Sequence, residues 1–278
     1  QALIILLIAP GVLGIIRTMK ARLQNRRGAS PFLPYWSLMT LLKKEMTISK
    51  NSSWIFHAVP FAVFGSTCLL ALIVPTLGVG FLDPSLDNVF MIAAVAAFGS
   101  VFLAMGGMDT GSTFGNMGAS REMTLAALVE PALYISFATL ALTAHTWSAG
   151  GIAAWFVGAS WLAVPFVLLT LVALTLVQLA ENARYPVDNP ATHLELTMVH
   201  EAMLLEYSGP YLAFLEYASA IKITVFGVFI ATLLFPVGLS TAVTLASIPV
   251  ALSAVVLKAI LVAVVVACIE TVIVKMRF

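Results

Sequence analysis

Long, nearly uninterrupted apolar segments recur along this 278-residue chain and limit its fold more than any other feature. A helix needs roughly 20 apolar residues to cross a bilayer, because lipid offers the backbone no hydrogen-bond partners. Seven windows approach or exceed that length: Gln1 to Ile16, Ile55 to Leu77, Val89 to Met108, Met123 to His145, Ile152 to Ala180, Tyr211 to Phe235 and Leu245 to Glu270. The composition agrees, since 61% of the residues are hydrophobic and 10% are charged. We expect an all-α polytopic membrane protein of about seven transmembrane helices, with residues 1–278 forming one membrane domain.

Lysine and arginine predict the orientation of these helices, because loops on the cytoplasmic side of a membrane are enriched in both residues. The segments after the first, third, fifth and seventh windows carry Arg17, Lys20, Arg22, Arg26, Arg27, Lys43, Lys44, Lys50, Arg121, Arg184, Lys275 and Arg277. The second, fourth and sixth intervening segments carry none. We therefore expect the N-terminus outside the cytoplasmic (inner) membrane and Phe278 inside.

The first window is short and begins without methionine, so we expect that a few residues precede Gln1. A cleaved signal peptide is the alternative, but the basic cluster follows the apolar run instead of preceding it.

Several functional classes find no support in the sequence. Cys68 and Cys268 each lie alone in an apolar window, without the spacing of a metal or cluster site. The sequence contains no glycine-rich nucleotide loop, no Ser/His/Asp set and no HExxH motif. The net charge of +1 gives no support for nucleic-acid binding. We expect no catalytic residue, metal or cofactor in this chain itself.

The first and second inner segments have different characters. Residues 34–44, PYWSLMTLLKK, favour a short interfacial helix with Tyr35 and Trp36 at headgroup depth. It is either a docking surface or a basic segment held by lipid. The second segment, Gly107 to Glu122, contains four glycines, and we expect it not to form a regular helix. Glu130 would then lie about two turns into the next helix, roughly 10 Å deep.

The third inner segment, Glu181 to Pro210, holds five acids and two histidines in an otherwise apolar chain. Asn189 and Pro190 are typical of a helix start, and Gly209 with Pro210 of a helix end, so a helix is expected along the membrane surface. A metal site built from His193, Glu195, His200 and Glu201 is conceivable but matches no known spacing. Proton handling is favoured, because buried, closely set carboxylates and histidines titrate near neutral pH.

The charges of the apolar windows suggest a hydrated polar axis. Each charge at a helix centre costs about 2.5 to 3.5 kcal/mol on insertion scales, so a series of them requires partners or water. We place the acids in the inner half and both lysines near the midplane. The alternative is that each lysine is structural, bound to a carbonyl or one acid. The expected ion path consists of Glu130, Glu181, Glu195, Glu201, Glu206, Glu216, Lys222 and Lys258.

Several motifs resemble the subunit 1 family of respiratory complex I, and more closely its relatives in energy-converting membrane [NiFe] hydrogenases and formate hydrogenlyases. The stretch ARLQNRRGAS is similar to the family's basic first-loop signature, although Ala29-Ser30-Pro31 replaces the usual Gly-Pro. The stretch MDTGSTFGNMGASREMTLAALVEP resembles the hydrogenase branch, including Arg121 and Glu130. ENARYPVD is similar to the complex I pattern ETNRAPFD, which carries over Glu181, Arg184, Pro186 and Asp188. EYSG at Glu206 to Gly209, Lys222 and Lys258 also fit the hydrogenase branch.

The resemblance implies a subunit that seats a hydrogenase-like module on the membrane and couples its electron transfer to ion translocation. It implies that a NiFe centre and iron-sulfur clusters belong to partners: hydrogenase-like large and small subunits, an iron-sulfur subunit and antiporter-like membrane subunits. Family members continue into one more helix after the region like KMRF, so the chain is either truncated or lacks an eighth helix. The residues expected to face partners are Arg22, Arg26, Arg27, Asp109, Arg121, Arg184, Asp188, His193 and His200.

Two alternatives remain open at this point. A quinone-reducing complex I subunit would use the first and third inner loops to frame a headgroup site, although VDNPATHLELTMVHEA replaces the family's acidic stretch. A stand-alone secondary ion transporter would be expected to show internal repeats and broken helices, and the sequence shows no such repeat.

Overall fold

The fold is all-α in the computed structural model, which describes residues 1–78, 86–158, 165–188, 199–239 and 247–273. Its helices are α1 (Ala2–Leu23), α2 (Leu33–Lys43), α3 (Trp54–Ile73), α4 (Val89–Asp109), α5 (Thr113–Ala144), α6 (Ala149–Gly158), α7 (Pro165–Glu181), α8 (His200–Leu204), α9 (Gly209–Leu234) and α10 (Ser247–Val272). Six of the described helices, α1, α3, α4, α5, α9 and α10, are long and apolar enough to span a membrane. The expected polytopic helical fold is therefore confirmed, while the orientation across a membrane stays a prediction.

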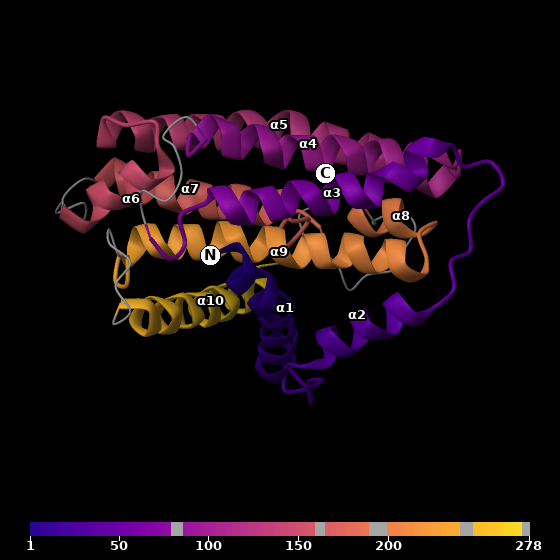
Figure 1. The fold of residues 1–278 in the computed structure, drawn as a ribbon, viewed down its shortest axis with the longest axis horizontal. Coiled ribbons are helices and arrows are strands. Elements are labelled where there is room, and N and C mark those ends of the chain that lie inside the picture. Colours follow the sequence, from indigo (N-terminus) through magenta and orange to yellow (C-terminus); the bar gives the residue numbers. More distant parts are fainter. Residues whose placement is uncertain (79–85, 159–164, 189–198, 240–246, 274–278) are drawn as a thin grey trace.

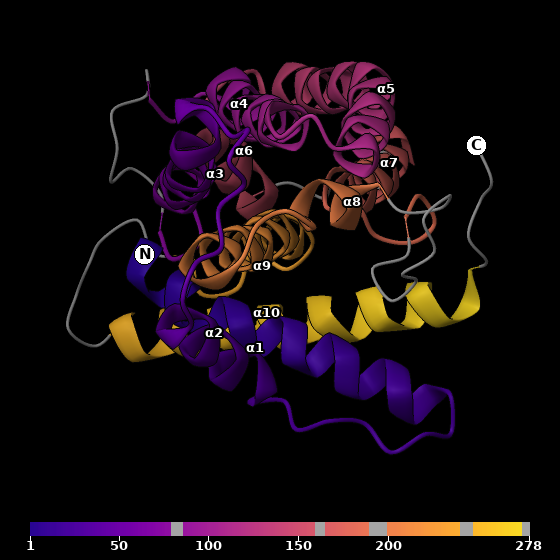
Figure 2. The same cartoon turned by 90° about the vertical axis from the view of Figure 1, so that its right-hand side faces the viewer.

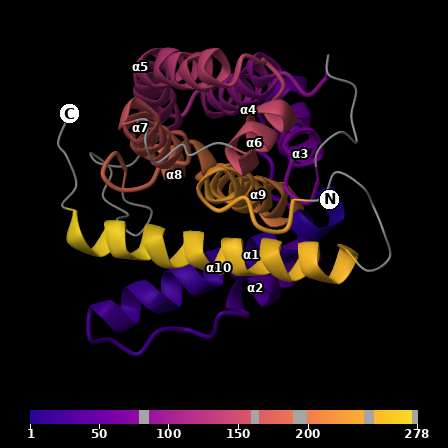
Figure 3. The ribbon, with the colours of Figure 1, turned by 90° about the vertical axis from the view of Figure 1, so that its left-hand side faces the viewer.

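Helix α9 lies at the centre of the molecule. Figures 2 and 3 show it nearly end-on, with α3 to α7 on one side and α1, α2 and α10 on the other. In its most apolar 18-residue window 78% of the residues are buried, a larger share than in any other candidate span. Helices α1 and α10 run side by side and cross obliquely beneath α9, whereas α3, α4 and α5 follow its direction (Figures 1 and 2). Side chains carried by α9 can therefore meet both groups of helices.

One expected boundary differs from the structure, and one expected window is described only in part. The window Ile152 to Ala180 contains most of α6 and α7, and residues 159–164 between them lie outside the described residues. The first window, expected to be short, belongs to α1, which extends through the basic residues to Leu23. Of the surface helix expected between Asn189 and Gly209, only α8 lies within the described residues, since 189–198 lie outside them.

The expectation that the glycine-rich segment 107–122 is non-helical is wrong, because α5 already begins at Thr113. The Ser112 side chain accepts a hydrogen bond from the Gly115 N–H at 3.2 Å and caps the helix. The glycines permit close packing, since a Cβ on Gly115 would lie 2.2 Å from the Gly107 carbonyl oxygen. A Cβ on Gly118 would lie 2.9 Å from the Val199 carbonyl oxygen next to α8. The glycines of α4 and α5 therefore let these two helices and α8 pack closely together.

The expected short helix in the first inner segment is confirmed as α2. Tyr35 donates a hydrogen bond to the Leu7 carbonyl of α1 at 2.6 Å, and Pro34 is buried against the molecule. Trp36 is exposed on the other side. This attachment fixes the rotation of α2 relative to α1.

Candidate ion path and charge network

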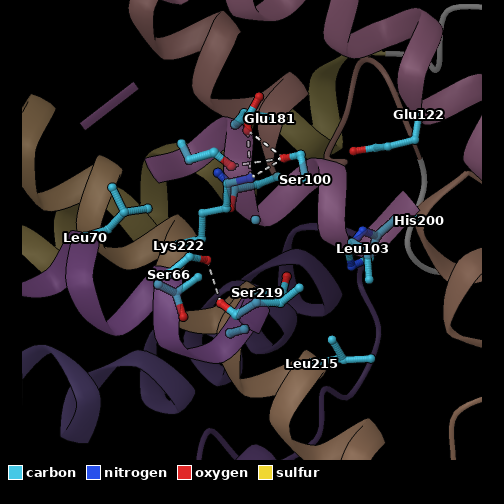
Figure 4. A pocket seen from close by; sticks show the side chains of 16 residues that line it. Ser66, Leu70, Ser100, Leu103, Glu122, Glu181, His200, Leu215, Ser219 and Lys222 are labelled. Carbon is cyan, nitrogen blue, oxygen red and sulfur yellow. Dashed lines mark hydrogen bonds and ion pairs between the residues drawn. The ribbon is translucent and has the colours of Figure 1, made fainter. Parts of the chain in front are cut away.

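The end of α7 and the middle of α9 and α4 bring one acid, one lysine and one serine together. Lys222 Nζ lies 2.7 Å from Glu181 Oε1 and 3.1 Å from Ser100 Oγ, and Ser100 donates to the same carboxylate oxygen at 3.1 Å. The side chains of Lys222 and Glu181 are only 14% and 6% exposed. Glu181 and Lys222, expected from sequence to share an ion path, therefore form a buried ion pair (Figure 4).

These three residues line a small cavity of about 40 Å³, which we call cavity A. Its wall also includes Glu122 of α5, whose carboxylate points into the cavity in Figure 4, and His200 of α8. Sequence reasoning missed Glu122 and Ser100. The only available signal for Glu122 was its place next to Arg121, and the expected loop there concealed its position on a helix. Cavity A has room for water, whose share of liquid volume is about 30 Å³.

A second cavity of about 80 Å³, cavity B, lies between α1, α2, α9 and the loop after α7. Its charged lining comprises Arg17, Arg184, Asp188, Glu201 and Glu216. Glu201 and Glu216 were expected in the ion path, and the structure places both at this cavity rather than at cavity A. Both cavities include Asn182, His200 and Ser219 in their walls.

A separate charge network joins α1, α10 and the loop after α7. Glu270 near the end of α10 binds Arg184 Nη1 at 3.0 Å and Lys20 Nζ of α1 at 2.9 Å. The Lys20 ammonium also lies 4.6 Å from the centre of the Tyr185 ring. Sequence reasoning treated Glu270 only as the end of a window and Arg184 as a partner-facing residue. In the structure Arg184 is buried and bound to Glu270.

Lys258 lies apart from Lys222, although the sequence placed both near the midplane. Its ammonium is 3.3 Å from the Thr232 hydroxyl of α9, and the residue is 6% exposed. Thr232 lies ten residues beyond Lys222, about 15 Å along an α-helix. Within the described part of the chain Lys258 forms no ion pair.

The other acids expected in the path are dispersed. Glu130 lies 17 residues after the start of α5, about 25 Å along the helix, so the estimate of two turns was wrong because α5 starts earlier than expected. Glu130 lines neither cavity A nor cavity B. Glu206 is exposed, and Glu195 lies outside the described residues.

The residues expected to face partners differ in how exposed they are. Arg22, Arg26 and Arg27 are exposed around the end of α1, whereas Arg121 on α5 is partly buried. Asp109 accepts hydrogen bonds from the backbone and the hydroxyl of Ser53, which caps α3.

The loop residues of the set are more enclosed. Asp188 is buried and accepts the backbone N–H groups of Val199 and His200 at 3.2 and 3.3 Å. His193 lies outside the described residues.

Electrostatics keep the loop histidine uncharged. Burial, followed by the positive charge of Lys222, lowers the pKa of His200 to about 4, against a smaller opposing influence of Asp188. His200 is therefore neutral at pH 7 and carries one donor and one acceptor nitrogen. Burial also raises the pKa of the Tyr185 hydroxyl in the loop after α7.

The described residues contain no group of three or more His, Cys, Asp or Glu side chains that could hold a metal ion. Of the conceivable site His193, Glu195, His200 and Glu201, the first two lie outside the described residues.

Comparison with known sequences gives matches along the whole chain. The model of the NADH dehydrogenase family matches residues 1–278. "Hydrogenase-4 component C" of Escherichia coli (strain K12) is 31% identical over 279 residues, which cover 100% of this chain and 87% of that protein. "Formate hydrogenlyase subunit 4" of the same organism is 31% identical over 226 residues, which cover 80% of this chain and 71% of that protein.

Among solved structures, a chain of the membrane-bound sulfane sulfur reductase, an archaeal respiratory membrane complex, superposes with a TM-score of 0.81. The match covers 99% of this chain and 90% of that chain at 19% sequence identity. At that identity the likeness shows a shared fold.

Proposed function

Because the chain belongs to the NADH dehydrogenase family and is a membrane subunit of a complex I-like complex, we propose that it couples electron transfer in a peripheral [NiFe]-hydrogenase-like module to ion translocation. It anchors that module and performs no bond chemistry itself. Its partners in this proposal are hydrogenase-like and iron-sulfur subunits, which hold the NiFe centre and clusters, and antiporter-like membrane subunits. The names of the two bacterial relatives support this assignment.

The buried Glu181–Lys222 pair is the observation that carries the proposal. A charged side chain inside a membrane protein is costly unless it is paired and hydrogen-bonded. Charged residues buried in this way are typical of ion pathways. The pair lines a water-sized cavity together with Ser100 and Glu122, and it lies next to the loop that begins at Asn182. A change of charge in a module docked on that loop would alter the proton affinity of these groups.

The test uses the complete complex reconstituted in vesicles, with ions translocated per electron pair as the readout. We expect Glu181→Gln and Lys222→Met to lower this ratio about tenfold or more while electron transfer continues, because a positioned proton carrier is lost. Lys44→Met, at an exposed lysine next to α2, is the matched control and keeps the wild-type ratio. Wild-type ratios in both path variants would overturn the proposal.

Partner identity needs its own experiment. After mild detergent extraction, the chain is expected to co-purify with hydrogenase-like and iron-sulfur subunits. Stable, active protein purified alone would favour a stand-alone transporter instead.

One observation favours quinone binding as a second candidate function. Cavity B is framed by Arg17 and α2 of the first inner segment and by Arg184, Asp188 and His200 of the third. That is the location expected for a quinone headgroup between these segments. Its volume of about 80 Å³ is small compared with typical ligand pockets of roughly 300 to 1,000 Å³. Inhibition of the complex by quinone-site ligands, lost in Arg17→Met, would support this second candidate.

A further inference from the structure

Cavities A and B are neighbours that share a wall. Asn182 at the end of α7, His200 at the start of α8 and Ser219 on α9 line both cavities. Cavity A contains the Glu181–Lys222 pair, and cavity B is bordered by Arg17, Glu201 and Glu216. A proton that moves between these two sets of charges by the shortest route must pass this wall.

The backbone that carries His200 is held in place by contacts on two sides. Asp188 accepts the N–H groups of Val199 and His200, which anchors the start of α8 to the loop after α7. On the other side, Gly118 of α5 allows α8 to approach so closely that a Cβ there would lie 2.9 Å from Ala202 Cβ. The backbone position of His200 is thus set from two directions.

The wall also contains a buried acceptor, Asn182 Oδ1, for which water is a suitable hydrogen-bond donor. Asn182 donates through Nδ2 to the Gln178 carbonyl at 2.8 Å, but its buried Oδ1 meets no hydrogen-bond donor among the described residues. Buried acceptors of this kind are usually satisfied by ordered water. Cavity volumes of about 40 and 80 Å³ on the two sides are large enough for water molecules.

We propose that Asn182, His200 and Ser219 form a proton-conducting partition between cavities A and B, in which the imidazole of His200 is the relay. One ring nitrogen accepts a proton from water in one cavity, and the other ring nitrogen releases its proton to water in the opposite cavity. The ring carries the same charge before and after the transfer and returns by exchange of its tautomers. Asn182 and Ser219 are positioning residues that hold the water on either side. The inference rests on the proposed ion-coupling function.

The surroundings of His200 suit a relay that does not trap the proton. Lys222 on the cavity A side and Arg184 on the cavity B side oppose a lasting positive charge on the ring, whereas Asp188 favours it. Glu122 and Glu181 face cavity A, and Glu201 and Glu216 face cavity B, so carboxylates able to exchange protons lie on both sides.

The experiment is chemical rescue in the reconstituted complex. His200→Ala is expected to lower proton translocation per electron pair about tenfold, because a positioned proton carrier is removed. Added imidazole is expected to restore most of it, with a pH dependence that follows the imidazole added. His57→Ala, at the exposed histidine of α3, is the control and should neither lose translocation nor respond to imidazole. Wild-type translocation by His200→Ala, or a loss that imidazole does not relieve, would overturn the proposal.

A second variant keeps the proposal testable if His200→Ala fails to fold. Asn182→Leu fills the wall with an apolar side chain and is expected to lower translocation about tenfold without response to imidazole; a wild-type ratio contradicts the partition. Lys222→Met distinguishes a failure of the partition from a failure of the proposed ion-coupling function. If Lys222→Met abolishes translocation while His200→Ala and Asn182→Leu do not, the partition is wrong and the proposed function stands. If none of the three variants changes translocation, the proposed function itself fails.

Discussion

Lys222 and Lys258 are both lysines in apolar helices, yet the structure gives them opposite environments. Lys222 meets a carboxylate at 2.7 Å and a hydroxyl at 3.1 Å beside a water-sized cavity. Lys258 meets one threonine hydroxyl at 3.3 Å. Burial of a lysine therefore does not by itself identify an ion path. A counter-ion, a second polar group and room for water set the Lys222 site apart, and the proposed function relies on these three features.

The largest expected effect comes from breaking the Lys222 pair one partner at a time. Glu181→Leu or Lys222→Leu leaves one buried charge unpaired and should lower the free energy of unfolding by about 3 kcal/mol. The double variant should cost clearly less than the sum, because no unpaired charge remains. Denaturant unfolding in detergent measures the cycle. Additive costs would show that the two groups do not interact.

The network at Glu270 tests whether a shared counter-ion behaves like the Lys222 pair. Glu270→Leu deprives both Arg184 and Lys20 of their partner and should cost about 2 to 3 kcal/mol in the same assay. Lys20→Leu should cost about 1 kcal/mol, because Arg184 keeps its bond and Lys20 is partly exposed. Equal losses from the two substitutions would contradict this description.

The pKa of His200 reports directly on which lysine is its neighbour. Its folded pKa of about 4 lies below the ordinary value of 6.5, so the unfolded chain binds more protons between these values. Stability is therefore full above pH 6.5 and is lost as pH falls toward 4, by at most about 1.4 kcal/mol per pH unit.

Titration by NMR measures this pKa in the variants of both lysines. Lys222→Met should raise it, because a positive charge is removed, whereas Lys258→Met should leave it unchanged. The comparison fails if the two variants shift it equally.

Lys258→Met is the direct counterpart of the Lys222 substitution. Because only one hydrogen bond is lost and no carboxylate is left behind among the described residues, the change in unfolding free energy should stay within about 1 kcal/mol. Ion translocation by the reconstituted complex should be retained. A loss of translocation equal to that of Lys222→Met would show that both lysines serve one path.

The smallest effect concerns the turn that presents Glu181. Ala183 has a positive φ of 47°, which costs an alanine energy that glycine avoids. Ala183→Gly should raise the unfolding free energy by about 0.5 kcal/mol. Ala180→Gly, inside α7, is the matched control and should lower it by up to about 1 kcal/mol. A loss at both positions would show that the turn is unstrained.

Apolar length and composition were sufficient to predict the helical membrane fold and the short helix α2, and the charges inside the apolar windows singled out Glu181 and Lys222, which the structure brings together as an ion pair. They were insufficient for the glycines, because glycine occurs both in loops and where two helices pack closely. Gly115 and Gly118 suggested a loop, yet they permit close contact between helices, which only the neighbouring elements reveal. The partners of Glu270, 250 and 86 residues away, depend on how α1 and α10 cross, and a single sequence contains no record of that crossing.

The central position of α9 has a consequence for the substitutions it can accept. A helix that contacts protein on nearly every side has almost no lipid-facing surface that must be apolar. Helix α9 can therefore carry Glu216 and Lys222 without exposing either side chain to hydrocarbon. The size of the side chains, rather than their polarity, limits which substitutions α9 can accept. A Cβ on Gly227 would lie 2.4 Å from a methyl carbon of Val262. Along α9, added bulk is therefore a greater threat to the native structure than added polarity.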